Sequence, residues 1–131
     1  MDTFGPKKRT KSQIGKASKA KGAAGERELA HFLSFHKFPA IRGVQYQGGK
    51  DSPDIKCDRL SMFQIECKRT EKLSIYKAVV QCEEDCGPEQ LPLVCHRQNG
   101  RPWISILRTE DFLNIMDELI ELRETVDAQS N

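Results

Sequence analysis

The stretch from Met62 to Arg69 constrains the fold most strongly, because its side chains alternate between apolar and polar. Glu66 and Lys68 fall on the polar side, and the apolar side comprises Phe63, Ile65 and Cys67. A period of two predicts a β-strand whose two faces have different surroundings. A single strand is not stable by itself, so we expect it to pair with a neighbouring strand in a sheet.

Helical and extended patterns on either side of this strand predict the other elements. We expect strand 53–58 to pair with strand 62–69 as a hairpin, and Asn99-Gly100 to turn a second hairpin. Thr109 is expected to cap the last helix. The expected elements are helices from about Ala23 to Pro39, over 73–84 and over 109–124, and strands over 40–46, 53–58, 62–69, 91–96 and 102–107.

This order of elements predicts a single α/β domain with a sheet of mixed direction covered by helices on its faces. A chain of 131 residues can bury the core of one domain but not of two. We therefore divide it into a disordered basic tail at 1–20, a folded domain at 21–108, an acidic amphipathic helix at 109–124 and a disordered tail at 125–131.

The two ends of the chain carry opposite charges. The first 22 residues have a net charge of +6, with Asp2 as their only acidic residue, and the residues from Thr109 onward have a net charge of −6, with Arg123 as their only basic residue. A basic segment of this kind is typical of a contact with nucleic-acid phosphates, because each neutralised phosphate releases counterions. A solvated end or a localisation signal is nearly as consistent with the charge alone.

The five cysteines are an odd number without a repeated CxxC spacing, which argues against a disulfide framework and a zinc ribbon. Cys82 and Cys86, with Cys95 and His96, form a conceivable metal site, but the spacing favours reduced packing residues. No apolar run approaches the roughly 18 residues that cross a bilayer, and the N-terminus lacks the apolar stretch of a secretory signal. We expect an intracellular protein, in the cytoplasm or nucleoid, without a membrane partner.

Three charged side chains on the two strands of the expected hairpin are candidates for chemistry. Glu66 and Lys68 share one strand face, and Asp54 begins the neighbouring strand after a glycine-rich loop. Close carboxylates repel unless a hard cation such as Mg²⁺ compensates them, and the backbone carbonyl of Cys67 is a third oxygen ligand for it. Lys68 would orient the attacking water and offset transition-state charge in phosphodiester hydrolysis. A solvated sheet face with ordinary ion pairs is the alternative.

Glu26 is a fourth candidate, on the first expected helix. It lies three residues before Leu29 and seven before Leu33, on the side of the helix that we expect to be buried. A buried carboxylate is costly unless it is paired or bound to a metal. A helix-start carboxylate that is favoured by the helix dipole is the equally weighted alternative.

The pattern Pro53-Asp54 followed by Gln64-Ile65-Glu66-Cys67-Lys68 resembles the signature of the PD-(D/E)xK nucleases. The segment 21–29 is similar to the helix that opens the archaeal-type Holliday junction resolvases and related phage nucleases. The resemblance covers about residues 21–107 and leaves the acidic C-terminal helix outside. It implies a restriction-endonuclease-like fold with an αβββαβ core, which this chain follows with a C-terminal helix.

Carried over to this chain, the resemblance implies that Glu26, Asp54 and Glu66 bind the metal and that Lys68 is the catalytic lysine. Arg42 falls where resolvases place a basic residue near the scissile phosphate. Gln81 falls where related nucleases carry a polar residue near the site, although a helix-surface glutamine is equally plausible. The implied cofactor is Mg²⁺, for which Mn²⁺ would substitute.

The resemblance further implies a homodimer that binds four-way DNA junctions and nicks two strands symmetrically, in DNA recombination and repair. The apolar stripe of the last helix either contributes to this dimer or packs on the sheet of its own chain. Two alternatives stay open: another nuclease with the same chemistry, such as a nickase or a restriction-like enzyme, and a non-catalytic DNA-binding module. The candidate DNA-binding residues are Lys7, Lys8, Arg9, Lys11, Lys21, Arg27, Arg42, Lys50 and Arg69.

Overall fold

The computed structural model describes residue 8, residues 10–43 and residues 54–130. The expected DNA-binding residues Lys7, Arg9 and Lys50 lie outside the described residues. In chain order the elements are α1 (Lys11–Phe35), β1 (Ile41–Arg42), β2 (Ile55–Lys56), the 3-10 helix η1 (Asp58–Leu60), β3 (Phe63–Arg69), α2 (Ile75–Asp85), β4 (Leu91–Arg97), β5 (Ile104–Ile106) and α3 (Thr109–Ser130).

The sheet around β3 is of mixed direction, as the sequence predicted. β3 runs parallel to β4, with Glu66 beside Val94 and Lys68 beside His96, and β4 runs antiparallel to β5. The turn at Asn99-Gly100 joins β4 to β5, and Gly100 has the positive φ of 69° that favours glycine there. The fold is therefore mixed α/β.

The expected hairpin between strands 53–58 and 62–69 is wrong. β2 pairs with β1 instead, in a separate antiparallel pair of strands, and η1 follows β2 directly. Two adjacent alternating segments suggest a hairpin, but β3 takes β4 as its partner. That parallel pairing requires a crossover, which α2 supplies.

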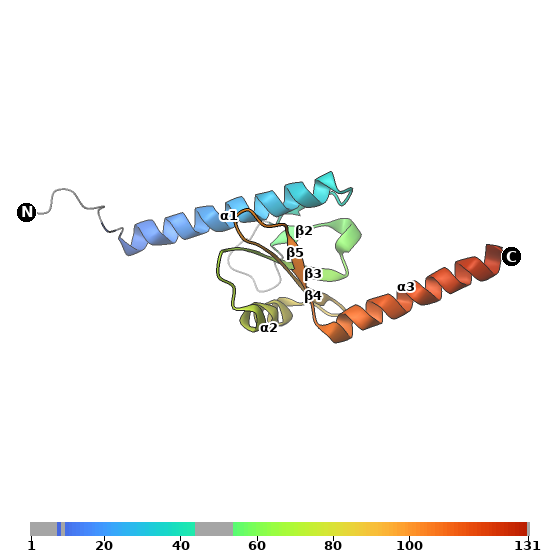
Figure 1. The fold of residues 1–131 in the computed structure, drawn as a ribbon. Coiled ribbons are helices and arrows are strands. Elements are labelled where there is room, and N and C mark those ends of the chain that lie inside the picture. Colours follow the sequence, from blue (N-terminus) through green and yellow to red (C-terminus); the bar gives the residue numbers. More distant parts are fainter. Residues whose placement is uncertain (1–7, 9, 44–53, 131) are drawn as a thin grey trace, which may run out of the picture.

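Helices cover the two faces of the sheet (Figure 1). On the face toward α1, Leu29 packs with Ile65 and Cys95, and Ile55 of β2 joins the same cluster. On the opposite face, the helix α2 contributes Ala78 and Cys82 to a second cluster. The alternation that was read in β3 thus separates two cores, with Glu66 and Lys68 on the α2 side.

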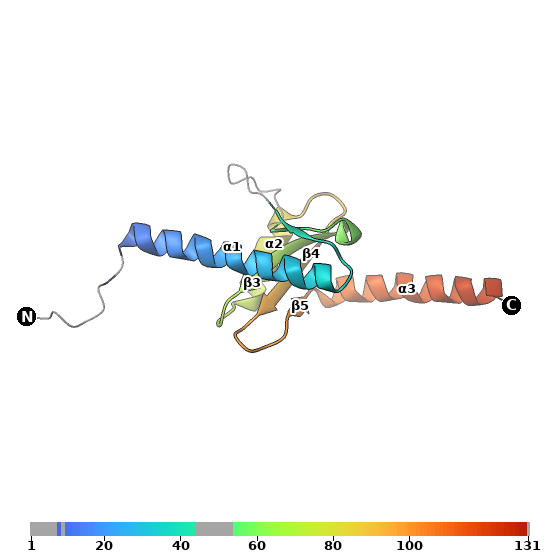
Figure 2. The same ribbon diagram turned by 90° about the horizontal axis from the view of Figure 1, so that it is seen from above.

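Helix α1 begins earlier than the sequence pattern indicated. We expected a disordered tail up to residue 20, but the helix starts at Lys11, where the Thr10 side chain and Gln13 form a reciprocal capping box. This cap satisfies the first backbone N–H groups without any apolar contact, which is why an apolar pattern does not reveal it. The first turns of α1 extend past the sheet (Figures 1 and 2).

Helix α3 also differs from the expectation at both ends. Thr109 is its first residue rather than its cap, and the helix continues to Ser130, through the segment that we expected to be disordered. It points away from the rest of the chain in both views (Figures 1 and 2) and has no extensive interface with any other described element. The alternative that its apolar stripe packs on its own sheet is therefore wrong. None of the described helices combines the length and apolar character that a membrane span needs.

Gly25 allows α1 to lie unusually close to β3. A Cβ at this position would stand 2.6 Å from the Cβ of Arg69, a side-chain root that cannot swing away. Gly25 is buried, and Glu26 follows it directly. The missing side chain therefore sets how closely Glu26 approaches the strand that carries Glu66 and Lys68.

We expect Gly25→Ala to lower the free energy of unfolding by about 1–3 kcal/mol, because the helix must shift away from Arg69 to admit the methyl group. Chemical denaturation of the purified protein measures this change. Gly22→Ala is the matched control: it lies in the same helix with no atom within 4 Å of an added Cβ, and should be neutral or stabilising by at most ~1 kcal/mol. Equal stability of the two variants would contradict the close approach.

Candidate active site

Asp54 is tied directly to the central strand. Its Oδ2 accepts a hydrogen bond of 2.9 Å from the backbone N–H of Cys67, and its own carbonyl accepts one of 2.8 Å from the N–H of Gly43. The Asp54 carboxylate thus lies beside β3 at the level of Cys67, the residue between Glu66 and Lys68, although β2 and β3 form no hairpin. The structure brings these three predicted residues together.

Lys68 is held from two sides. Its Nζ lies 3.6 Å from Oε1 of Glu66 on the same strand and donates a 3.2 Å hydrogen bond to Oε1 of Gln81 on α2. The glutamine, which the sequence left as either an accessory residue or an ordinary surface residue, therefore contacts the lysine directly. Two acceptors on different elements restrict where the ammonium group can lie.

The carboxyl groups of Asp54 and Glu66 lie in a poorly solvated place. Burial is the main cause that raises the pKa of Asp54, and the charge of Glu26 adds to it, against the Cys67 hydrogen bond and Lys68, which lower it. Burial likewise raises the pKa of Glu66, with Asp54 adding to it and Lys68 opposing it. The ionised pair is thus destabilised without a further positive charge.

One oxygen of Glu66 shows this most directly. Oε2 of Glu66 is buried and has no hydrogen-bond partner among the residues that the structure describes, and the whole side chain is only 13% exposed. A buried carboxylate oxygen that finds no donor costs free energy in proportion to its lost hydration. Such an oxygen is free to accept a cation, and it is the kind of donor that Mg²⁺ prefers.

Glu26 lies on α1, on the buried side of the helix as predicted. Its carboxylate forms an ion pair with Nε of Arg42 on β1, and its side chain is 15% exposed. Its charge nevertheless contributes to the raised pKa of Asp54. Glu26 and Arg42, which were predicted near the site from distant segments, therefore pair with each other, close to Asp54.

The described residues fit a magnesium site only in part. Within the described ranges, no three acidic, histidine or cysteine side chains gather closely enough to hold a metal ion by themselves. Asp54 and Glu66 are two hard oxygen donors with raised pKa values, and Mg²⁺ is commonly bound by one or two carboxylates that waters and substrate phosphates complete. The donor chemistry fits on those terms.

The sequence did not single out Asp85, at the end of α2. Its charge adds to the raised pKa of both Asp54 and Glu66. It follows Gln81 by four residues, so both side chains share the helix face toward the sheet. That spacing was the available signal, but it becomes informative only once Gln81 is known to face the site.

The expected DNA-binding residues lie in different surroundings. Arg69 is engaged within the fold: it pairs with Glu28 at 3.1 Å and donates a 2.9 Å hydrogen bond to Asn99, while Arg97 pairs with the same glutamate. This link between α1, β3 and β4 was not anticipated. The exposed candidates are Lys8, Lys11, Lys21, Arg27 and Arg42.

The cysteines considered as an alternative metal site do not face one another. Cys82 lies in the cluster on the α2 face, where its thiol donates to the carbonyl of Gln64, whereas Cys95 lies in the cluster on the α1 face. Burial raises the pKa of the Cys82 thiol to about 12. All five cysteines are free thiols, and four of them, Cys57, Cys67, Cys82 and Cys95, pack in the two hydrophobic clusters.

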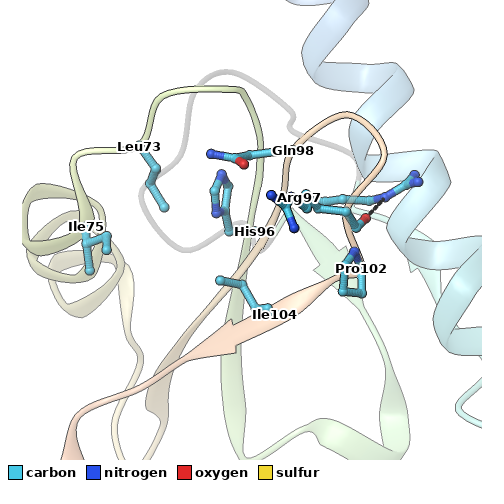
Figure 3. A pocket seen from close by; sticks show the side chains of 8 residues that line it. Leu73, Ile75, His96, Arg97, Gln98, Pro102 and Ile104 are labelled. Atoms are coloured by element: carbon cyan, nitrogen blue, oxygen red, sulfur yellow. Dashed lines mark hydrogen bonds between the residues drawn. The ribbon is translucent and has the colours of Figure 1, made fainter.

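A cavity of about 350 Å³ lies between the start of α2 and the hairpin of β4 and β5. Figure 3 shows Leu73 and Ile75 facing His96 and Ile104 across it. Its other polar lining comes from Arg97, Gln98 and Arg101, and none of the described lining residues is a carboxylate. His96 is held by a 2.8 Å contact of Nε2 with the carbonyl of Thr70. The residues that line this cavity thus differ from Asp54, Glu66 and Lys68.

Glu66→Gln should stabilise the metal-free protein at neutral pH, by roughly 0.5–2 kcal/mol, because it removes a buried charge. The pKa of Glu66 is raised above its ordinary value of 4.5, so the native state binds more protons than the unfolded state between those two values. Wild-type stability therefore falls as pH rises through that window, and the variant escapes the loss.

Denaturant unfolding in the presence of a chelator, at pH 7 and below pH 4.5, measures the effect. The gain should be present at pH 7 and should vanish at the lower pH. Glu84→Gln, an exposed carboxylate on α2, is the control and should change stability little. A variant less stable than the wild type at pH 7 would show that the Glu66 charge is already compensated.

Comparison with known protein families matches residues 17–130 to the family described as archaeal Holliday junction resolvase (Hjc). No curated protein and no solved structure matches the chain. The family match includes α3, so the C-terminal helix lies inside the family's span and not outside it, where the sequence resemblance had placed it. With its restriction-endonuclease-like fold, the chain belongs to the archaeal Holliday junction resolvase family, whose members are nucleases.

Proposed function

We propose that the protein is a metal-dependent, structure-selective DNA endonuclease that resolves four-way junctions by paired phosphodiester hydrolysis. The observation that carries this proposal is the buried, unpartnered Oε2 of Glu66 beside Asp54 and Lys68. Proteins rarely retain such a group for stability, because it costs free energy. The unpartnered Glu66 oxygen is explained if it binds a metal ion that the reaction requires.

Asp54 and Glu66 would hold Mg²⁺, or Mn²⁺ in its place, and the backbone carbonyl of Cys67 would be a third ligand. When bound, such an ion supplies a polarised phosphate oxygen and a more acidic water. Glu26 would join the ligands only if its carboxylate exchanged Arg42 for the ion. Arg42, once released, would be available for the scissile phosphate.

Lys68 would act on the water and the phosphate. Its position between Glu66 and Gln81 leaves one N–H of the ammonium group available for a third acceptor. An ammonium group held in place offsets the negative charge that develops on the phosphate oxygens without having to reorganise during the reaction. Gln81 would be a positioning residue, because it touches the lysine and not the substrate.

A homodimer would account for paired incision, since each chain carries one set of these residues and a four-way junction offers two equivalent strands. The exposed lysines of α1 would contact DNA phosphates, together with Lys7, Arg9 and Lys50. Arg27 lies on the same helix, close to Glu26. These contacts would supply affinity for DNA, whereas Asp54, Glu66 and Lys68 would carry out the hydrolysis.

We expect Asp54→Asn and Lys68→Ala to lower the cleavage rate of a four-way junction by at least about 100-fold while junction binding persists. The assay compares junctions, forks, nicked duplexes and linear duplexes with Mg²⁺. Asp58→Asn, an exposed carboxylate in η1, is the control and should cleave normally. Calorimetric titration with Mg²⁺ alone gives a second readout, in which Asp54→Asn should bind the ion more weakly.

Three outcomes would overturn all or part of this proposal. Equal rates in Asp54→Asn and the wild type would remove the assigned site. Cleavage of linear duplexes as fast as junctions would favour a restriction-like enzyme or a nickase, and binding that ignores Mg²⁺ with no cleavage of any substrate would favour a non-catalytic DNA-binding module.

Lys11→Gln combined with Lys21→Gln should weaken junction binding and lower the salt dependence of log K by about 0.9 for each phosphate that the lysines no longer neutralise. Both lysines are exposed on α1, away from Lys68, so the rate at saturating enzyme should not change. Lys77→Gln, an exposed lysine on α2, is the control. An unaltered salt slope would exclude the first turns of α1 from the DNA interface.

A further inference from the structure

Helix α3 exposes apolar side chains along its whole length. Leu119 is 38% exposed, Leu122 64% and Val126 57%, and all three lie well inside a helix of 22 residues. The helix forms no extensive interface within the described chain (Figures 1 and 2). An apolar face of this length is normally covered in the functional assembly.

The spacing of these side chains is that of a coiled coil. Five apolar residues recur at intervals of three, four, three and four, which is the average period of 3.5 that keeps a seam facing a partner helix. In heptad terms they occupy alternating a and d positions. The seam consists of Phe112, Ile115, Leu119, Leu122 and Val126.

The charges beside the seam fit a second copy of the same helix. Arg123 is the only basic residue of α3, and it occupies the e position on one flank of the seam. Glu118 occupies the g position on the other flank, five residues earlier. In a parallel pair of helices, g of one chain faces the following e of the other, so each Glu118 meets the partner's Arg123 and symmetry gives two such pairs.

The remaining acidic residues do not oppose this arrangement. Asp111 also flanks the seam, but there it faces Met116, which carries no charge. An antiparallel pair would bring g to g and would separate Glu118 from Arg123. The other acidic residues lie on the outer positions b, c and f, namely Glu110, Asp117, Glu121, Glu124 and Asp127.

Two residues of this seam also line a shallow hollow on α3. This hollow of about 250 Å³ lies against the last third of the helix, lined by Leu122, Arg123, Val126 and Asp127. The apolar flank formed by Leu113 and Ile120 lies outside this seam.

We propose that α3 pairs in parallel with α3 of a second copy, through the seam from Phe112 to Val126, and that this pairing holds the dimer together. The inference deepens the proposed function, because it names the surface by which two nuclease domains are joined. A parallel pair places both domains at the same end of the paired helices. The Asp54, Glu66 and Lys68 of both chains then lie at that same end, where paired incision of one junction needs them.

Sedimentation of the full-length protein over the micromolar range tests the pairing. The wild type should be a dimer, and the double variant Leu119→Glu with Leu122→Glu should be a monomer whose core is intact by circular dichroism and chemical denaturation. Asn114→Glu adds a charge on the outer face of the same helix and is the matched control, which should still dimerise. A monomeric wild type, or a dimer that survives the seam variant, would overturn the proposal.

The orientation has its own test. Glu118→Arg should weaken the dimer roughly three- to tenfold, and the exchange Glu118→Arg with Arg123→Glu should restore it. No recovery in the exchange variant would overturn the parallel arrangement. A dimer that Ile120→Glu dissociates but the seam variant does not would overturn the seam.

These results are independent of cleavage. Loss of the dimer in the seam variant, with a wild type that cleaves no junction, would support the pairing while rejecting the proposed function. If both hold, the monomeric seam variant should leave singly nicked junctions where the wild type gives paired cuts.

Discussion

The hydrogen bond from the Cys67 amide to the carboxylate of Asp54 is the contact on which the site depends. β2 pairs with β1 among the described strands, so the backbone ladder alone does not hold Asp54 to β3. The side chain makes that connection, at the one residue that lies between Glu66 and Lys68. The Cys67 side chain packs against the core on the α1 face, whereas Glu66 and Lys68 lie on the α2 side.

Two glutamates close to the sheet show how differently this fold treats carboxylates. Glu28 receives guanidinium groups from both Arg69 and Arg97, so its charge is matched where it joins α1 to the ends of β3 and β4. From the described residues, Glu66 receives one ammonium group, and its second oxygen receives no hydrogen bond. The ion pairs of Glu28 stabilise the fold, whereas the burial of Glu66 costs stability. This pattern is expected where a protein retains an unfavourable group for its function.

Much of this arrangement could be predicted from local sequence patterns, and the errors have particular causes. The alternation at 63–68 correctly assigned each side chain of β3 to its face, because strand periodicity is a local property. The partner of β3 was predicted wrongly, since β4 lies beyond α2 in the chain and no local pattern encodes that pairing. The start of α1 was missed because a capping box and lysine-rich turns carry no apolar period. Gln81 was found by resemblance, whereas Asp85 and the pairing of Glu26 with Arg42 needed the helix faces to be placed.

The sequence by itself determined that Glu66 and Lys68 share a face, because spacing along a strand dictates side-chain direction. It also contained the seam of α3, a periodicity that requires no knowledge of the rest of the fold. Only the tertiary structure decided that Asp54 reaches β3 through its side chain. Within the part of the chain that the structure describes, it also left one oxygen of Glu66 without a partner and α3 without a covering element. Each of these depends on what surrounds a group in space, and burial and pairing are set by segments that are distant in the chain.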